Sequence, residues 1–177
     1  AQSVAVSGVD DLVHQFTGYT SGVWVMTCYQ YIPSDMTGQA FFILLNTYAV
    51  GGPNNWSTQV SMTTGLVEDA DGGGGSVPTA TDSWAEIEIV LNFDDDEQTF
   101  FYNGAVVRQG SWTEGASGGG VLNFGAIDLW SNGASVHYYD DLTIEVGSPD
   151  GACCFSDGTC TGPVSSADCD TAGGTFQ

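Results

Sequence analysis

Apolar residues along most of the chain alternate with polar ones or form short continuous runs, and both patterns are typical of β-strands. The segment 84–93 alternates, so it predicts a strand with Glu86 and Glu88 on one face and Ile87 and Ile89 on the other. The segments 22–32 and 39–50 are apolar or aromatic at successive positions, as in a strand that is covered on both faces. No sustained helical period occurs, so the fold class is all-β.

Turn signals separate about ten such strands, and this spacing predicts an antiparallel β-sandwich of the jelly-roll type over residues 1–146. Within it, an acidic turn follows the strand that begins at Trp84, and Asn103-Gly104 predicts a tight hairpin. After Val146 large apolar residues become rare and four cysteines occur. Residues 147–177 therefore predict a short tail module held by disulfides.

The charge of the chain limits its partners. The sequence holds 22 acidic residues against one lysine or arginine, Arg108, which gives a formal charge of −21. Nucleic acid and anionic membranes are excluded as partners, because both require a positive patch. No apolar run is long enough for membrane insertion. The clustered cysteines indicate an oxidising compartment, so we expect an extracellular or cell-surface location.

The acidic turn is the candidate metal site. Carboxylates that are close together in a loop suit calcium, which prefers hard oxygen ligands. The alternative is a turn whose carboxylates only face solvent. The sequence therefore predicts Ca²⁺ as a possible cofactor, with four candidate ligands: Asp94, Asp95, Asp96 and Glu97.

The tryptophans are the candidate glycan-binding residues, because an aromatic ring can stack on the apolar face of a pyranose. Trp24 and Trp84 lie within predicted strands, and we expect them in the core. The other three, Trp56, Trp112 and Trp130, lie beside predicted loops and are the candidates for contact with a polysaccharide.

The tail cysteines predict two disulfides. Bonding the adjacent Cys153 and Cys154 to each other would strain the peptide. Two pairings remain open: Cys153–Cys160 with Cys154–Cys169, or Cys153–Cys169 with Cys154–Cys160. The remaining Cys28 lies in an apolar strand and predicts a buried free thiol. The alternative is that an unpaired cysteine bonds to another subunit.

The order of tryptophan, alternating strand, acidic turn, aromatic strand and Asn-Gly over residues 84–104 resembles laminin-G-like and concanavalin-A-like jelly rolls. The segments 11–22, 29–48, 55–60 and 138–145 are similar to secreted β-sandwich domains of planctomycete-type bacteria. This resemblance implies further strands ahead of Ala1. The tail resembles a small Cys-rich module of secreted bacterial proteins, in which another cysteine would follow Gln177.

The same superfamily includes glucanases, whose active strand reads Glu-x-Asp-x-x-Glu. In this alignment Glu86 takes the first position and Glu88 the second, but Leu91 takes the third, where the resemblance implies an acid/base carboxyl. Retaining hydrolysis requires two carboxyls about 5–5.5 Å apart, one of them protonated. We therefore expect a protein that is not an enzyme.

Two functions follow from these observations. The first is a structural or adhesive subunit of an extracellular assembly, whose partners are copies of itself or other extracellular proteins joined through exposed strand edges. The second is a carbohydrate-binding, lectin-like module that uses the loop tryptophans. The resemblance fits both, because a fold does not determine a function.

Overall fold

The computed structural model describes residues 3–147, 151–164 and 172–176. The chain divides into two compact units, Ala1–Glu145 and Val146–Gln177. Throughout these described ranges the regular elements are β-strands, and no α-helix occurs. Accordingly, the described residues include no helix with the length and apolar character needed to cross a membrane.

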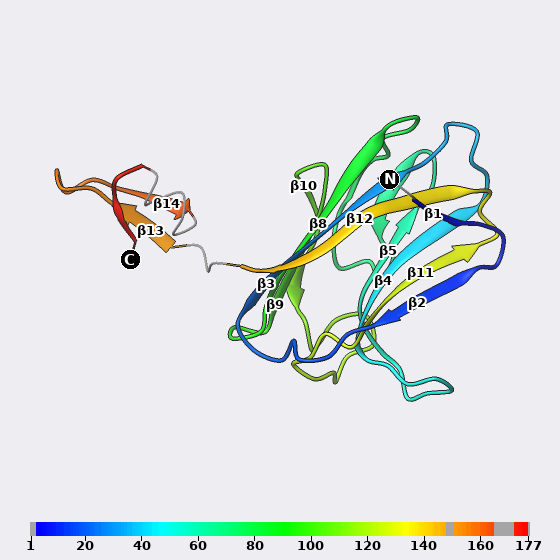
Figure 1. The fold of residues 1–177 in the computed structure, drawn as a ribbon, viewed down its shortest axis with the longest axis horizontal. Helices are drawn as coiled ribbons and strands as arrows, with labels where there is room; N and C mark the ends of the chain where they lie inside the picture. The colour runs from blue at the N-terminus through cyan, green and yellow to red at the C-terminus, as the bar shows by residue number, and fades with distance from the viewer. Residues whose placement is uncertain (1–2, 148–150, 165–171, 177) are drawn as a thin grey trace. The chain divides into compact units, whose positions relative to one another are not determined.

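The first unit is a sandwich of two sheets with six strands each, and the predicted antiparallel β-sandwich is confirmed (Figure 1). Sheet A contains, in spatial order, β1 (Val4–Val6), β12 (His137–Val146), β3 (Val23–Tyr31), β8 (Trp84–Asn92), β9 (Glu97–Tyr102) and β10 (Ala105–Ser111). Sheet B contains β2 (Asp11–Gln15), β11 (Ala126–Asn132), β4 (Gln39–Thr47), β5 (Asn55–Met62), β6 (Leu66–Asp69) and β7 (Ser76–Pro78).

The strand that begins at Trp84 and the predicted hairpin form β8, β9 and β10 of sheet A. Asn103 and Gly104 connect β9 to β10 with φ angles of 48° and 74°. Both values lie in the left-handed region that a two-residue hairpin turn of this type requires, which explains the Asn-Gly pair. A bulge between Val106 and Arg108 interrupts the β9–β10 register, so that Val107 and Arg108 are both buried.

The main core fills the space between the two sheets. Strand β8 contributes Ile87, Ile89 and Leu91 to it, as the alternation predicts, and β4 contributes Phe42 and Leu44. All five are essentially inaccessible to solvent. Burying a side chain of this size stabilises the fold by about 1.5–3 kcal/mol, so this layer holds the two sheets together.

The second unit contains β13 (Gly151–Cys154), β14 (Cys160–Val164) and β15 (Thr175–Phe176), which form one sheet. Cys154 and Cys160 form a disulfide, so the pairing of Cys153 with Cys160 is wrong. Cys153 is disulfide-bonded as well, and Cys169 lies outside the described residues. The paired β13 and β14 bring Cys154 and Cys160 opposite each other, and this register selects the bond.

Cys28 is a buried free thiol, as predicted. It lines a cavity of about 330 Å³ at the side of the sandwich where β12 of sheet A approaches β2 and β11 of sheet B. Burial raises the pKa of Cys28 to about 12. The thiol is therefore protonated and unreactive at neutral pH.

Candidate functional site

The outward side of sheet B carries a second apolar cluster. Alternation along β4 directs Phe42 and Leu44 into the main core and Phe41, Ile43 and Leu45 away from it. The outward residues are nevertheless only 8%, 2% and 1% exposed. Side chains of neighbouring segments cover them, namely Val13, Tyr48 and Trp130. We call this surface the sheet B face and define it by Asp11, Val13, Phe41, Ile43, Leu45, Tyr48, Trp56, Gln59, Ala126, Asp128 and Trp130.

Two of the predicted tryptophans lie on this face. Trp130 stacks on Phe41 with ring centroids 5.0 Å apart and an angle of 22° between the rings. Trp56 is paired with Leu45 between two register shifts of the β4–β5 ladder, and this pairing assigns Trp56 to the same face as Leu45. Trp56 is 40% exposed. The sheet B face therefore combines a stacked aromatic pair with a separate, accessible indole.

The two tryptophans mark an elongated surface. Trp130 is opposite Phe41 and Trp56 is opposite Leu45, on the two strands that flank β4. Four residues along a strand span about 13 Å, and two strand spacings span about 10 Å. The rings are thus far enough apart to contact different units of one extended ligand. In Figure 1, β4 lies between β5 and β11, with β2 beyond β11.

A pair of carboxyl groups lies beside the aromatic stack. Asp11 of β2 is opposite Trp130, and Asp128 of β11 is opposite Val13, so all four share the sheet B face. Burial, then a hydrogen bond and charge repulsion from Asp11, raise the pKa of Asp128 to about 7. Oδ1 of Asp128 is buried and has no hydrogen-bond partner among the described residues. The interaction with Asp11 requires a proton, and these effects hold that proton on Asp128.

The outward side of sheet A differs from the sheet B face. Glu86 and Glu88 are partly exposed on β8, as the alternation predicts. The Tyr29 hydroxyl donates a hydrogen bond to Oε1 of Glu86 over 3.1 Å. Partial burial and the charge of Glu86 raise the pKa of Glu88. No third carboxyl is among the hydrogen-bond or charge partners that the structure gives this pair.

Trp84 and Trp112 are placed contrary to expectation. Trp84 is 46% exposed and packs near Tyr31 on the outward side of sheet A, so its expected place in the core is wrong. It is the first residue of β8, where the alternation directs it away from the core. Trp112 is fully buried against Phe93 and Phe124. Trp112 therefore cannot stack on a sugar, although it precedes a loop.

The acidic turn uses its carboxylates to hold neighbouring segments. Asp94 accepts a hydrogen bond from the Gly22 amide, and Asp95 accepts one from Asn92. Burial alone would raise the pKa of Asp96, but hydrogen bonds from Ser111 and Thr113 hold it below its ordinary value. Glu97 begins β9 and is exposed. Within the described ranges no group of three or more acidic, histidine or cysteine side chains could hold a metal, and calcium remains a prediction.

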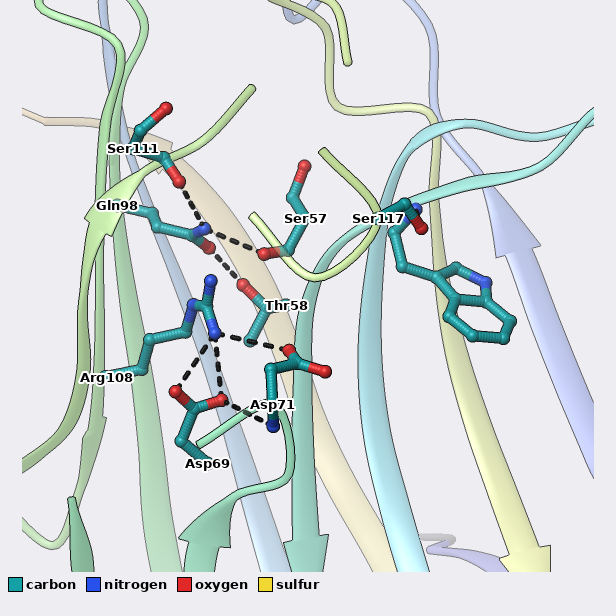
Figure 2. Close-up of polar contacts among 9 residues, drawn as sticks. Ser57, Thr58, Asp69, Asp71, Gln98, Arg108, Ser111 and Ser117 are labelled. Atoms are coloured by element: carbon teal, nitrogen blue, oxygen red, sulfur yellow. Dashed lines mark hydrogen bonds and ion pairs between the residues drawn. The ribbon is translucent and has the colours of Figure 1, made fainter. Parts of the chain in front are cut away.

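Arg108, which is the single lysine or arginine of the sequence, lies inside the sandwich (Figure 2). Nη1 of Arg108 lies 2.8 Å from Oδ1 of Asp69 and 3.2 Å from Oδ2 of Asp71. Burial raises the pKa of Asp71, although the charge of Arg108 lowers it. Above this cluster Gln98 of β9 accepts a hydrogen bond from Thr58 of β5. These contacts join sheet A to sheet B, and they leave Arg108 unable to reach the sheet B face.

Asp11, Asp128 and Phe41 were not identified from the sequence. One signal was available: in the segment 126–130, Ile127 and Leu129 are apolar, so Asp128 and Trp130 must share the opposite face. The proximity of Asp11 to Asp128 could not be predicted from the sequence, because it depends on the register between β2 and β11. The sequence holds no local pattern that fixes this register.

No protein-family model matches the sequence, and neither does any curated protein. Solved structures do share the fold. A sialidase superposes with a TM-score of 0.58 at 9% identity over 84% of this chain and 15% of its own. The carbohydrate binding module CBM66 from Bacillus subtilis superposes with a TM-score of 0.51 at 10% identity, over 79% of this chain and 83% of its own.

A family 7 alginate lyase, A1-II′, superposes with a TM-score of 0.46 at 15% identity over 71% of this chain. This chain thus spans 15% of the sialidase and 61% of the lyase. At such identities the likeness concerns the β-sandwich fold alone.

Proposed function

We propose that this protein is a carbohydrate-binding, lectin-like module that acts outside the cell and binds glycans on the sheet B face. The observation that carries the proposal is the gathering of the Trp130–Phe41 stack and the accessible Trp56 on one outward surface. A soluble protein normally places such apolar side chains in its core. A contiguous apolar surface rimmed by polar groups is typical of a binding site.

The chemistry of this face suits a sugar. An indole ring offers a flat apolar surface for the C–H groups of a pyranose, and the polar groups beside it can bind hydroxyls. Asp11 and Gln59 lie on the same face as the two tryptophans, and a carboxylate accepts hydrogen bonds whereas an amide both donates and accepts them. A few polar groups around an apolar surface are the usual composition of a ligand site.

The fold supports this proposal, because a carbohydrate binding module is among the proteins that share it. We do not assign catalysis to the face: its carboxyls, Asp11 and Asp128, interact with each other through a hydrogen bond and charge repulsion. Glycosidases instead hold their two carboxyls about 5 Å apart or more. The structural or adhesive role remains a separate prediction, and the disulfide in the second unit is consistent with an extracellular location for either role.

Binding of the intact protein to a panel of immobilised glycans tests the proposal, with Trp56→Ala as the test variant. Truncating an aromatic residue that anchors a ligand costs about 2 kcal/mol or more, so we expect affinity to fall by about thirtyfold. The matched control is Trp84→Ala, which removes a similarly exposed tryptophan from sheet A. Equal affinity of the Trp56→Ala variant and the wild type would contradict the proposal, as would the absence of binding to every glycan.

A further inference from the structure

We propose that the sheet B face selects glycans with free amino groups, such as oligomers of 2-amino-2-deoxy sugars, over neutral, uronate and sulfated glycans. This inference rests on the proposed function and specifies its ligand class. Its basis is the strand register that places Asp11 opposite Trp130. The arginine and histidine side chains of the chain lie outside this face.

An anionic glycan meets no cationic side chain on the sheet B face. Carboxylate and sulfate groups are bound through arginine or lysine. The chain has one such residue, Arg108, which is buried and paired with Asp69 and Asp71. Burial lowers the pKa of His137 and keeps it neutral, and His14 lines the cavity near Cys28. With a formal charge of −21, the protein repels a polyanion.

An ammonium group has two partners at one point of the face. Asp11 is exposed and lies directly opposite Trp130 in the β2–β11 register. A carboxylate accepts a charge-assisted hydrogen bond from an ammonium, and the face of an indole attracts the same cation. A sugar that stacks on Trp130 can therefore present its amino group to Asp11.

Asp128 is neutral below about pH 7 and adds no second charge to this point of the face. Its Oδ1 is buried without a hydrogen-bond partner, and burial together with the hydrogen bond and the charge of Asp11 keeps the proton on Asp128. An incoming ammonium then meets a carboxylate that is already oriented by its neighbour, at the edge of the Trp130–Phe41 stack.

The test compares two ligands that differ only at the amino group. Glucosamine oligomers and N-acetylglucosamine oligomers of equal length are titrated into the intact protein by calorimetry at slightly acidic pH and moderate salt. An exposed ion pair contributes up to about 1 kcal/mol and a cation–π contact about 0.5–1 kcal/mol, so together we expect the free amine to bind about tenfold more tightly. Acetylation removes the charge while it leaves the ring surface for stacking.

Two charge-matched variants separate a specific contact from general attraction to an acidic protein. Asp11→Asn should reduce the preference for the amine to less than about threefold, because it lowers the affinity for the free amine much more than the affinity for the acetylated oligomer. Asp35→Asn removes the same charge from an exposed turn outside the sheet B face, and it should keep the full preference. Equal losses in the two variants would show that bulk charge causes the preference, and the inference would be wrong.

Failure of this inference is distinguishable from failure of the proposed function. If both oligomers bind equally, or the acetylated one binds more tightly, the ligand class is wrong while the sheet B face remains a glycan site. If neither oligomer binds but another glycan does so in a Trp56-dependent manner, the conclusion is the same. If no glycan binds at all, both proposals are overturned.

Discussion

The two outward surfaces of the sandwich differ in how they follow the β-strand alternation. Strand β8 of sheet A obeys it: Ile87 and Ile89 are buried in the core, whereas Glu86 and Glu88 lie partly exposed outside. Strand β4 of sheet B breaks it, because its residues from Ala40 to Asn46 are all buried. The second surface therefore has a cover of its own, made by side chains such as Trp130.

This difference indicates where to look for function. An alternating strand needs one partner surface, and the core supplies it. A strand that is apolar on both sides needs a second one. In sheet B only part of that second surface is buried by the protein itself, since Trp56 remains 40% exposed. The unfilled part is the place where a ligand can add contacts.

Arg108→Met should produce the largest effect and should affect both surfaces together. The variant leaves the buried Asp69 without its cation and removes the partner of the more exposed Asp71, and removal of one partner of a buried ion pair costs about 3–5 kcal/mol. Urea denaturation measures the loss in the free energy of unfolding. The control is Gln109→Met, at the next and exposed position of β10, which should change this free energy by less than about 0.5 kcal/mol. A similar small change in both variants would show that the cluster does not hold the sheets together.

Ile43→Ala compares the two surfaces directly. Ile43 is 2% exposed on the sheet B face, so its truncation should cost about 2–4 kcal/mol, as in a protein core. Val90→Ala, at a half-buried outward position of β8, should cost less than about 1 kcal/mol. Denaturant midpoints of the two variants give the difference. Equal costs would contradict the conclusion that the sheet B face has its own apolar layer.

Much of this comparison could be predicted from the sequence. The apolar run from Gln39 predicted a strand that is covered on both sides. The alternation from Trp84 predicted that Glu86 and Glu88 of β8 face solvent. Trp112 shows the limit. It precedes a loop but points inward from the end of β10, because loop proximity does not determine the direction of a side chain. Asp11 and Asp128 were beyond prediction for another reason: their contact joins strands more than 100 residues apart through a register that no local motif records.

Asp128→Asn should alter the pH dependence of stability on the sheet B face. The pKa of Asp128 in the folded protein is raised to about 7, whereas in the unfolded chain it is about 3.9. The folded state thus binds the proton more tightly, and the free energy of unfolding falls as pH rises from about 4 to about 7. The variant lacks this titration. Relative to the wild type, its melting temperature should therefore rise across this window and stay constant above it.

The groups around Asp128 make this titration separable from others. Asp11 faces it from β2, and the opposing residue of β4 is the apolar Ile43. Carboxyls with lowered pKa values, such as Asp96, titrate below pH 4 and have the opposite sign. Melting curves of the two proteins at intervals between pH 4 and pH 8 give the difference. A constant offset at every pH would show that Asp128 titrates normally.

The double variant Glu86→Gln/Glu88→Gln should have the smallest effect. Both side chains are partly exposed on sheet A, and the Tyr29 hydroxyl can donate to a glutamine oxygen as it does to Glu86. The raised pKa of Glu88 follows from partial burial and from Glu86, so removal of both charges also removes a repulsion. We expect a change in the free energy of unfolding within about 0.5 kcal/mol and unaltered glycan binding. If the wild type hydrolyses a glycan and this variant does not, an active site lies on sheet A instead. Such a loss would show that the two carboxyls act as a catalytic pair.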